Sequence, residues 1–102
     1  MASRKIAFRR IADAALSYAD AIVQRWLPDG RREGREWVAH NPKRTDHRPG
    51  SFKVNLHNGR WGDFSSGERG GDLVALAAFL FSLNQADAAK RVAEMLGLDP
   101  YE

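Results

Sequence analysis

The chain contains no cysteine among its 102 residues. A disulfide framework and a thiolate metal site are therefore excluded, and we expect a protein of the reducing cytoplasm. No apolar run approaches the roughly 20 residues that a membrane-spanning helix needs, so no membrane segment is expected. Histidine is also scarce. His40, His47 and His57 match no standard zinc spacing, which disfavours a metal-dependent hydrolase built on them and predicts no metal site.

Motifs for catalysis and for nucleotide binding are missing as well. Ser65 and Ser66 lack the Gly-x-Ser-x-Gly setting of a nucleophilic serine. The glycine-rich turn before Asp72 lacks the Gly-Lys-Ser/Thr ending of a phosphate loop, and Asp72 itself would repel an anion. No nucleophile, base and orienting group come together. We therefore expect no catalytic residue, no cofactor and no enzyme activity of this chain by itself.

Positive charge is present but unevenly distributed. Residues 1–60 hold 13 Lys and Arg against 6 Asp and Glu, whereas residues 61–102 hold 3 against 7. A basic surface favours a polyanionic partner, for which nucleic acid is the first candidate. The alternative at this point is a solvated basic face that keeps the protein soluble.

Length and hydrophobic patterns predict one α+β domain over residues 1–102. Apolar residues at i, i+3 and i+4 spacing predict a long N-terminal helix over 7–26. A small antiparallel sheet is expected over about 36–64, followed by a helix pair over 72–96. The predicted fold is therefore a small sheet packed against two or three helices.

The clearest local signal is a β-hairpin in the middle of the chain. Residues 51–57 alternate between apolar and polar, which is typical of a strand with one buried face. Asn58-Gly59 favours a two-residue type I′ turn, and residues 60–64 return as the partner strand. This turn places Leu56 opposite Trp61.

That register divides the hairpin into two faces of different chemistry. One face is apolar and is predicted to join the core: Phe52, Val54, Leu56 and Trp61. The other face is cationic, polar and aromatic: Lys53, Asn55, His57, Arg60 and Phe64. Such a face suits single-stranded nucleic acid, because cations follow the phosphates while an aromatic ring stacks on a base. The alternative is a solvated face in which Phe64 folds under a loop, and a one-residue slip would exchange the two faces.

The order of these segments resembles a known family. The segments are Pro49-Gly50-Ser51-Phe52-Lys53-Val54, then Arg60-Trp61-Gly62-Asp63-Phe64-Ser65-Ser66-Gly67, then Gly70-Gly71-Asp72-Leu73-Val74-Ala75-Leu76, then Ala93-Glu94-Met95-Leu96-Gly97. Together they resemble the N-terminal zinc-binding domain of bacterial DnaG-type primases and of plasmid and phage primase-helicases, over roughly residues 37–97. The resemblance implies a zinc-ribbon-like sheet.

The zinc ligands of that family are replaced in this chain. The first ligand pair would fall near Pro42 and Thr45, and the second on Asp63 and Ser66. The resemblance therefore implies a metal-free relative. Because zinc supplies folding energy to small ribbons, we expect apolar burial by the long N-terminal helix and the three tryptophans, Trp26, Trp37 and Trp61, to replace it.

In that family the domain contacts the single-stranded template and assists a separate catalytic domain. The resemblance thus implies a template-binding module of a primase or replication protein of a plasmid, phage or other mobile element. The matching contact residues are Lys53, Arg60 and Phe64; Arg44, Arg48, Asn55 and His57 are secondary candidates. The alternative function is a protein-interaction module that holds a helicase or polymerase through the N-terminal helix or through exposed Trp26 or Trp37.

Overall fold

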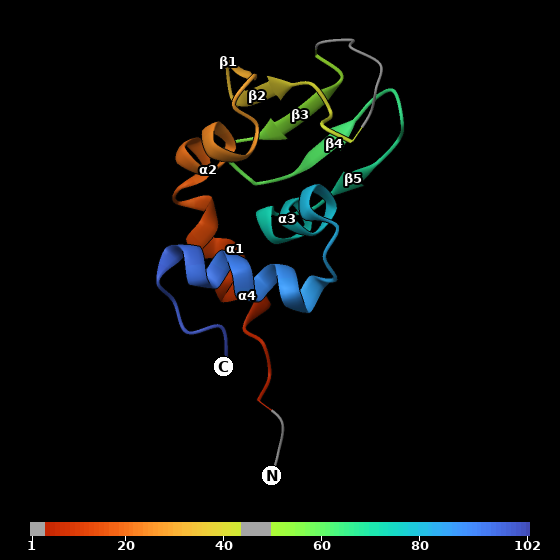
Figure 1. Ribbon diagram of the computed structural model, residues 1–102. Coiled ribbons are helices and arrows are strands. Elements are labelled where there is room, and N and C mark those ends of the chain that lie inside the picture. The colour runs from red at the N-terminus through yellow and green to blue at the C-terminus, as the bar shows by residue number, and fades with distance from the viewer. Residues whose placement is uncertain (1–3, 44–49) are drawn as a thin grey trace.

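Two helices precede a single sheet and two follow it along the chain in the computed structural model, which describes residues 4–43 and 50–102 (Figure 1). The helices are α1 (Phe8–Leu16), α2 (Ala19–Trp26), α3 (Leu73–Phe81) and α4 (Gln85–Leu96). The strands are β1 (Arg31–Glu33), β2 (Glu36–Ala39), β3 (Phe52–Asn55), β4 (Trp61–Asp63) and β5 (Arg69–Gly70). The predicted α+β class is confirmed. Arg44 and Arg48 lie outside the described residues.

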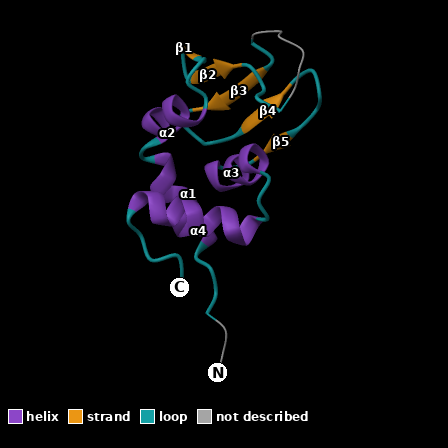
Figure 2. Ribbon diagram, in the orientation of Figure 1, coloured by secondary structure: helices purple, strands orange, loops and turns teal. Residues whose placement is uncertain are grey.

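The five strands form one antiparallel sheet in chain order, β1-β2-β3-β4-β5. Figure 2 shows this sheet at one end of the molecule, α1 and α4 at the other end, and α2 and α3 between them. The sheet is wider than the predicted 36–64, because β1 and β5 add an edge strand on each side. Both are too short for alternation to reveal them: β1 is exposed along its whole length, and β5 has two residues.

The core lies between the sheet and α3, where three aromatic rings meet. The Phe52 and Trp61 ring centroids are 5.8 Å apart, and Phe79 of α3 lies 5.1 Å from Trp61 and 6.0 Å from Phe52. α3 is apolar around most of its surface, as a helix covered on several sides must be. α3 therefore covers one face of the sheet, while the other face is turned toward solvent.

Two tryptophans of the sheet pack directly on glycines. A Cβ on Gly30 would lie 2.2 Å from the Trp37 indole, and one on Gly70 would lie 2.5 Å from Trp61, so neither position has room for a side chain. The Trp37 indole N–H donates to the Leu27 carbonyl oxygen at 3.0 Å. Trp37 is only 9% exposed, so the expectation that it offers a docking surface is wrong. Its ring is needed to fill the core.

The N-terminal helix predicted over 7–26 is two helices. The N–H groups of Ser17 and Tyr18 bond to the carbonyls of Ala14 and Ala15, three residues back, at 3.2 and 2.9 Å. Such tightened bonds end α1 and turn the chain before α2. The break places α1 against α4 while α2 lies nearer the sheet (Figure 1). Among the described residues, no helix has the length and hydrophobicity needed to cross a membrane.

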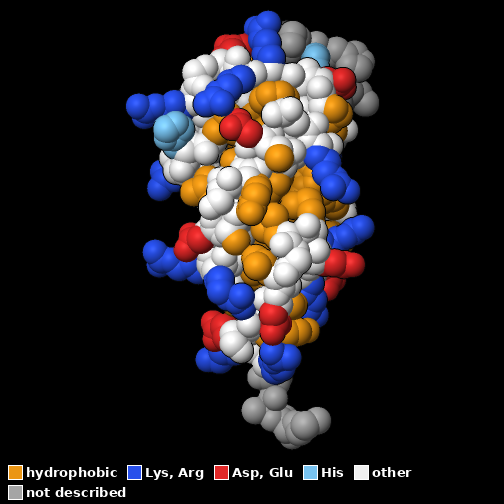
Figure 3. All heavy atoms as spheres, turned by 90° about the vertical axis from the view of Figure 1, so that its left-hand side faces the viewer, with side chains coloured by type: hydrophobic (Ala, Val, Ile, Leu, Met, Phe, Trp, Pro, Cys, Tyr) orange, Lys and Arg blue, Asp and Glu red, His pale blue; other side chains and the backbone are white. Residues whose placement is uncertain are grey.

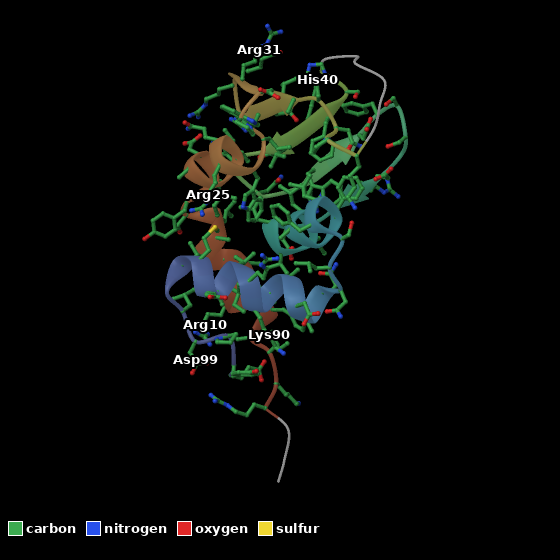
Figure 4. The ribbon with its side chains drawn as sticks, in the orientation of Figure 1. Arg10, Arg25, Arg31, His40, Lys90 and Asp99 are labelled. Carbon is green, nitrogen blue, oxygen red and sulfur yellow. The ribbon has the colours of Figure 1, made fainter. Side chains whose placement is uncertain are left out.

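The two ends of the described chain lie against each other. The Ala7 N–H donates to Pro100 and the Glu102 N–H donates to Lys5, both at 2.8 Å. The Arg10 guanidinium donates to the carbonyl oxygens of Asp99 and Tyr101 at 3.0 and 2.6 Å, and Figure 4 shows it beside the C-terminal segment. These bonds hold the segment after α4 on α1.

The hairpin register differs by two residues from the predicted one. Trp61 lies opposite Val54, not Leu56, and the Asn55 N–H bonds to the Arg60 carbonyl at 2.7 Å. The turn is therefore longer, because the Asn55 side-chain oxygen accepts from the N–H groups of His57 and Asn58 at 2.8 and 3.1 Å. Since the shift is an even number, the face assignment within the strands survives.

Candidate nucleic-acid interface

The face of the sheet turned away from α3 carries a row of two cations with a glycine between them. Lys53 of β3 pairs with Gly62 of β4, and Gly62 pairs with Arg69 of β5. Residues paired across antiparallel strands project on the same side, so Lys53 and Arg69 flank a position that has no side chain. The glycine leaves open space at the centre of the row.

That space is part of a cleft of about 450 Å³, here called the sheet cleft. Its lining residues include Lys53, Asn55, Arg60, Gly62, Phe64 and Arg69. Four of them were predicted for one face from the sequence: Lys53, Asn55, Arg60 and Phe64. The strand pairing thus brings these four together although the turn differs from the expected type.

The most exposed aromatic side chain of the cleft lies beside a cation. Phe64 is 80% exposed, and the Lys53 ammonium lies 5.4 Å from the centroid of its ring. The Phe64 backbone is nevertheless fixed, because its N–H donates to the Ser51 carbonyl at 3.0 Å. The alternative in which Phe64 folds under a loop is therefore wrong. A ring that is held at its backbone and is largely exposed can stack on a planar ligand.

Arg60 and Arg69 are exposed and add two further positive charges around the cleft. Sequence reasoning missed Arg69, which lies in a glycine-rich segment predicted to be a loop. It also missed Gly62, which has no side chain and lies between Lys53 and Arg69 across the strands. In the sequence, a glycine within a strand and a single arginine seven residues later do not indicate a shared surface. Only the pairing of β4 with β5 shows that Gly62 and Arg69 lie side by side.

Three acidic residues also line the cleft: Glu36 of β2, the buried Asp63 of β4, and Glu68 of the β4–β5 loop. They would repel phosphate groups, so phosphates are favoured only beside the cations. A carboxylate can instead accept a hydrogen bond from an exocyclic amino group of a base. The cleft therefore combines groups for a polyanionic backbone with groups for a base edge.

Asn55 and His57, both predicted for the outer face of the hairpin, differ from that prediction in the structure. The Asn55 carboxamide oxygen already accepts the two turn N–H groups, so Asn55 shapes the hairpin as well as lining the cleft. His57 is exposed in the turn and lines a separate hollow near Asp20 and Arg32, between the sheet and the α1–α2 junction. The structure therefore does not bring His57 into the sheet cleft.

A buried polar cluster lies beside the cleft, on the core side of β4. The Asp63 carboxylate, 3% exposed, accepts from the Asn41 amide at 2.8 Å and from the Ser65 N–H and hydroxyl at 2.8 and 2.7 Å. Burial alone would raise the pKa of Asp63, but the hydrogen bonds from Asn41 and Ser65 outweigh it and hold that pKa well below its usual range. This cluster links the end of β2 to the start of the β4–β5 loop.

No protein-family model matches the chain, and no curated protein matches it. The fold, however, is similar to that of a primase. A crystal structure of the Aquifex aeolicus primase, containing zinc-binding and RNA polymerase domains, superposes with a TM-score of 0.73 at 17% sequence identity. The match covers 93% of this chain and 22% of the primase chain. At this identity the likeness shows the fold alone, and it supports the primase zinc-binding-like fold that the sequence resemblance implied.

Within residues 4–43 and 50–102, the side chains at the implied positions do not fit a zinc ion. Of the four positions implied by the resemblance, Pro42 has no donor atom and Thr45 lies outside the described residues. The Asp63 carboxylate is engaged by Asn41 and Ser65, and the described part of the chain holds no group of three His, Cys, Asp or Glu able to bind a metal. At this end of the sheet, the hydrogen bonds that Asp63 accepts from Asn41 and Ser65 join the segment after β2 to the β4–β5 loop.

Proposed function

We propose that this chain binds single-stranded DNA in the sheet cleft. The observation that carries the proposal is the Phe64 ring, 80% exposed, with the Lys53 ammonium 5.4 Å from its centroid and Arg60 lining the same cleft. An aromatic ring that stacks on a base, beside cations that contact phosphates, is the usual arrangement of proteins that bind single strands.

Each cleft residue has a distinct task in this proposal. A base stacks on Phe64 above the open position at Gly62, and the flanking phosphates lie near Lys53, Arg60 and Arg69. Glu36 and Glu68 accept hydrogen bonds from amino groups at the base edge. None of these groups performs a reaction, so the chain is a binding module without catalysis of its own.

The module belongs, in this proposal, to a primase or replication protein of a plasmid, phage or other mobile element. The support is the primase-like fold together with the fact that the match spans only 22% of the primase chain. A binding domain of this size positions template for a catalytic domain that lies elsewhere. Binding would raise the local concentration of template beside that catalytic domain.

The test is a titration of the isotope-labelled chain with a short mixed-sequence DNA strand at two salt concentrations. We expect NMR shifts at Lys53, Gly62, Phe64 and Arg69 that fade as salt rises, because phosphate contacts release counterions. The variant Arg60→Glu should weaken binding by about tenfold. Lys90→Glu makes the same charge change on α4, away from the cleft, and should leave the affinity within about twofold. Equal weakening by the two variants would show that only net charge matters.

A further inference from the structure

A second hollow of about 350 Å³ lies among α2, α3 and α4, on the opposite side of the core from the outer sheet face. We call it the helix groove. Its lining residues are Arg25 and Trp26 of α2, Ala77 and Phe81 of α3, and Arg91, Val92 and Met95 of α4. It shares no lining residue with the sheet cleft.

The floor of the helix groove is apolar and partly open to solvent. Trp26 and Phe81 pack edge to face with ring centroids 5.5 Å apart and an interplanar angle of 87°. Trp26 is half-buried, and Phe81 is 45% exposed at the end of α3. Met95 is half-buried beside them and, having an unbranched thioether, adapts its shape to a ligand. Aromatic and aliphatic surface thus meets at one concave site.

Two exposed arginines, Arg25 and Arg91, stand at the groove. The ion pairs found among residues 4–43 and 50–102 are Arg4–Asp99, Arg31–Glu33 and Arg32–Asp20, so neither groove arginine is paired within that part of the chain. Figure 4 shows Arg25 projecting from α2 on the side of α4. Figure 3 shows hydrophobic side chains gathered at mid-height on this side of the molecule, with Lys and Arg side chains beside them.

An apolar floor with cations beside it is complementary to a helix that is apolar on one face and acidic at its edges. Helices dock in such grooves through apolar residues at i, i+4 and i+7, and carboxylates pair with arginines in bidentate contacts. Tryptophan and arginine are also the residues that most often dominate binding energy in protein interfaces. A nucleic acid fits less well, because Val92, Met95 and Ala77 give it no further ring for stacking.

We propose that the helix groove binds an acidic amphipathic helix of a partner protein. The partner inserts an aromatic or aliphatic side chain against Trp26 and Phe81, and its Asp or Glu residues pair with Arg25 and Arg91. This proposal does not depend on DNA binding, because the groove and the sheet cleft lie on different elements. It gives the chain a second contact, suited to holding it beside another protein.

The experiment uses two synthetic helical peptides of about 18 residues and the isotope-labelled full chain. Both peptides carry Phe and Leu at i, i+4 and i+7; one has Glu at its flanking positions and the other has Lys. The Glu peptide should shift the signals of Trp26, Phe81 and Met95 and bind at least about tenfold more tightly than the Lys peptide. Absence of these shifts, or equal affinity for the two peptides, would overturn the proposal.

Charge reversal in the protein gives an independent check that does not disturb the core. The double variant Arg25→Glu with Arg91→Glu should prefer the Lys peptide, whereas the control pair Arg9→Glu with Lys90→Glu should keep the wild-type preference. Phe81→Ser removes exposed apolar area and should weaken both peptides several-fold. If a DNA strand shifts the groove signals more strongly than the Glu peptide does, the groove is a nucleic-acid site and the proposal fails.

Discussion

At the scale of single residues, Phe64 is the side chain on which the proposed DNA binding depends most directly. Its ring is exposed while its backbone is held by Ser51, so truncation removes stacking surface without opening the core. Stacking of one base on an aromatic ring contributes about 1–3 kcal/mol. We therefore expect Phe64→Ala to weaken binding of a DNA strand roughly 5- to 150-fold, as measured by fluorescence anisotropy. Phe81→Ala, an equal truncation at the helix groove, should leave DNA affinity unchanged, and Phe64→Trp should retain it.

Gly62 gives a residue-scale prediction of the opposite kind, in which a side chain is added. A Cβ at this position would lie 3.4 Å from the Glu68 carbonyl oxygen and 3.5 Å from the Arg69 Cβ, ordinary contact distances. Gly62→Val should therefore fold, since a branched side chain suits a strand, and should fill the space between Lys53 and Arg69. We expect DNA binding to fall at least about tenfold with the thermal midpoint maintained. Gly71→Val, at an exposed position with open space around it, is the matched control.

At the scale of elements, the Asn41–Asp63–Ser65 cluster joins the end of β2 to the β4–β5 loop. Hydrogen bonds to a charged group contribute about 1.5–3 kcal/mol each, so Asn41→Ala should lower the free energy of unfolding by about that amount. Asp63→Asn should also destabilise the fold, because an amide N–H₂ would replace an oxygen that now accepts a hydrogen bond. Urea unfolding at pH 7 measures both changes, and Asp29→Asn on an exposed turn should cost far less.

The same cluster predicts a loss of stability in acid. The pKa of Asp63 is lowered in the folded protein, so the unfolded chain takes up a proton first as the pH falls below about 4, the ordinary pKa of an aspartate. The stability that the ionised carboxylate contributes is therefore complete above that pH and declines below it. Between pH 5 and pH 3 the wild-type urea midpoint should fall more than that of Asp63→Asn. Parallel curves for the two proteins would show that Asp63 does not carry this dependence.

Sequence patterns predicted the elements better than the way in which they are joined. The helix pair was predicted correctly, and so was the alternation of buried and outward residues within β3 and β4, because periods of 3.6 and 2 residues survive small shifts. His57, predicted for the outer face, lies in the turn instead. The turn was wrong because the Asn55 side chain competes for the backbone N–H groups of the turn. The row of Lys53, Gly62 and Arg69 could not be predicted from the sequence, because β5 is defined only by its pairing with β4. The hydrogen bond from Asn41 was not predicted, because its acceptor, Asp63, lies 22 residues away in the sequence.

At the scale of the whole molecule, the sheet cleft and the helix groove lie on different surfaces and share no residue. A DNA strand in the cleft and an acidic helix in the groove should therefore bind at the same time. Both ligands are anions, but salt at 0.15 M screens charge over about 8 Å, which limits repulsion between them. We accordingly expect a coupling free energy near zero between the two sites.

The measurement is the affinity for a labelled DNA strand with and without a saturating amount of the Glu peptide. We expect a change of twofold or less at 0.15 M salt, and a ternary complex in analytical ultracentrifugation. The salt slope gives the internal control: contacts to Lys53, Arg60 and Arg69 predict that log affinity falls with log salt with a slope of about −2 for a single strand. That slope should be the same whether or not the groove is occupied. Competition, in which the peptide releases the DNA, would mean that both anions bind one surface. The assignment of DNA to the sheet cleft and of the acidic helix to the helix groove would then be wrong.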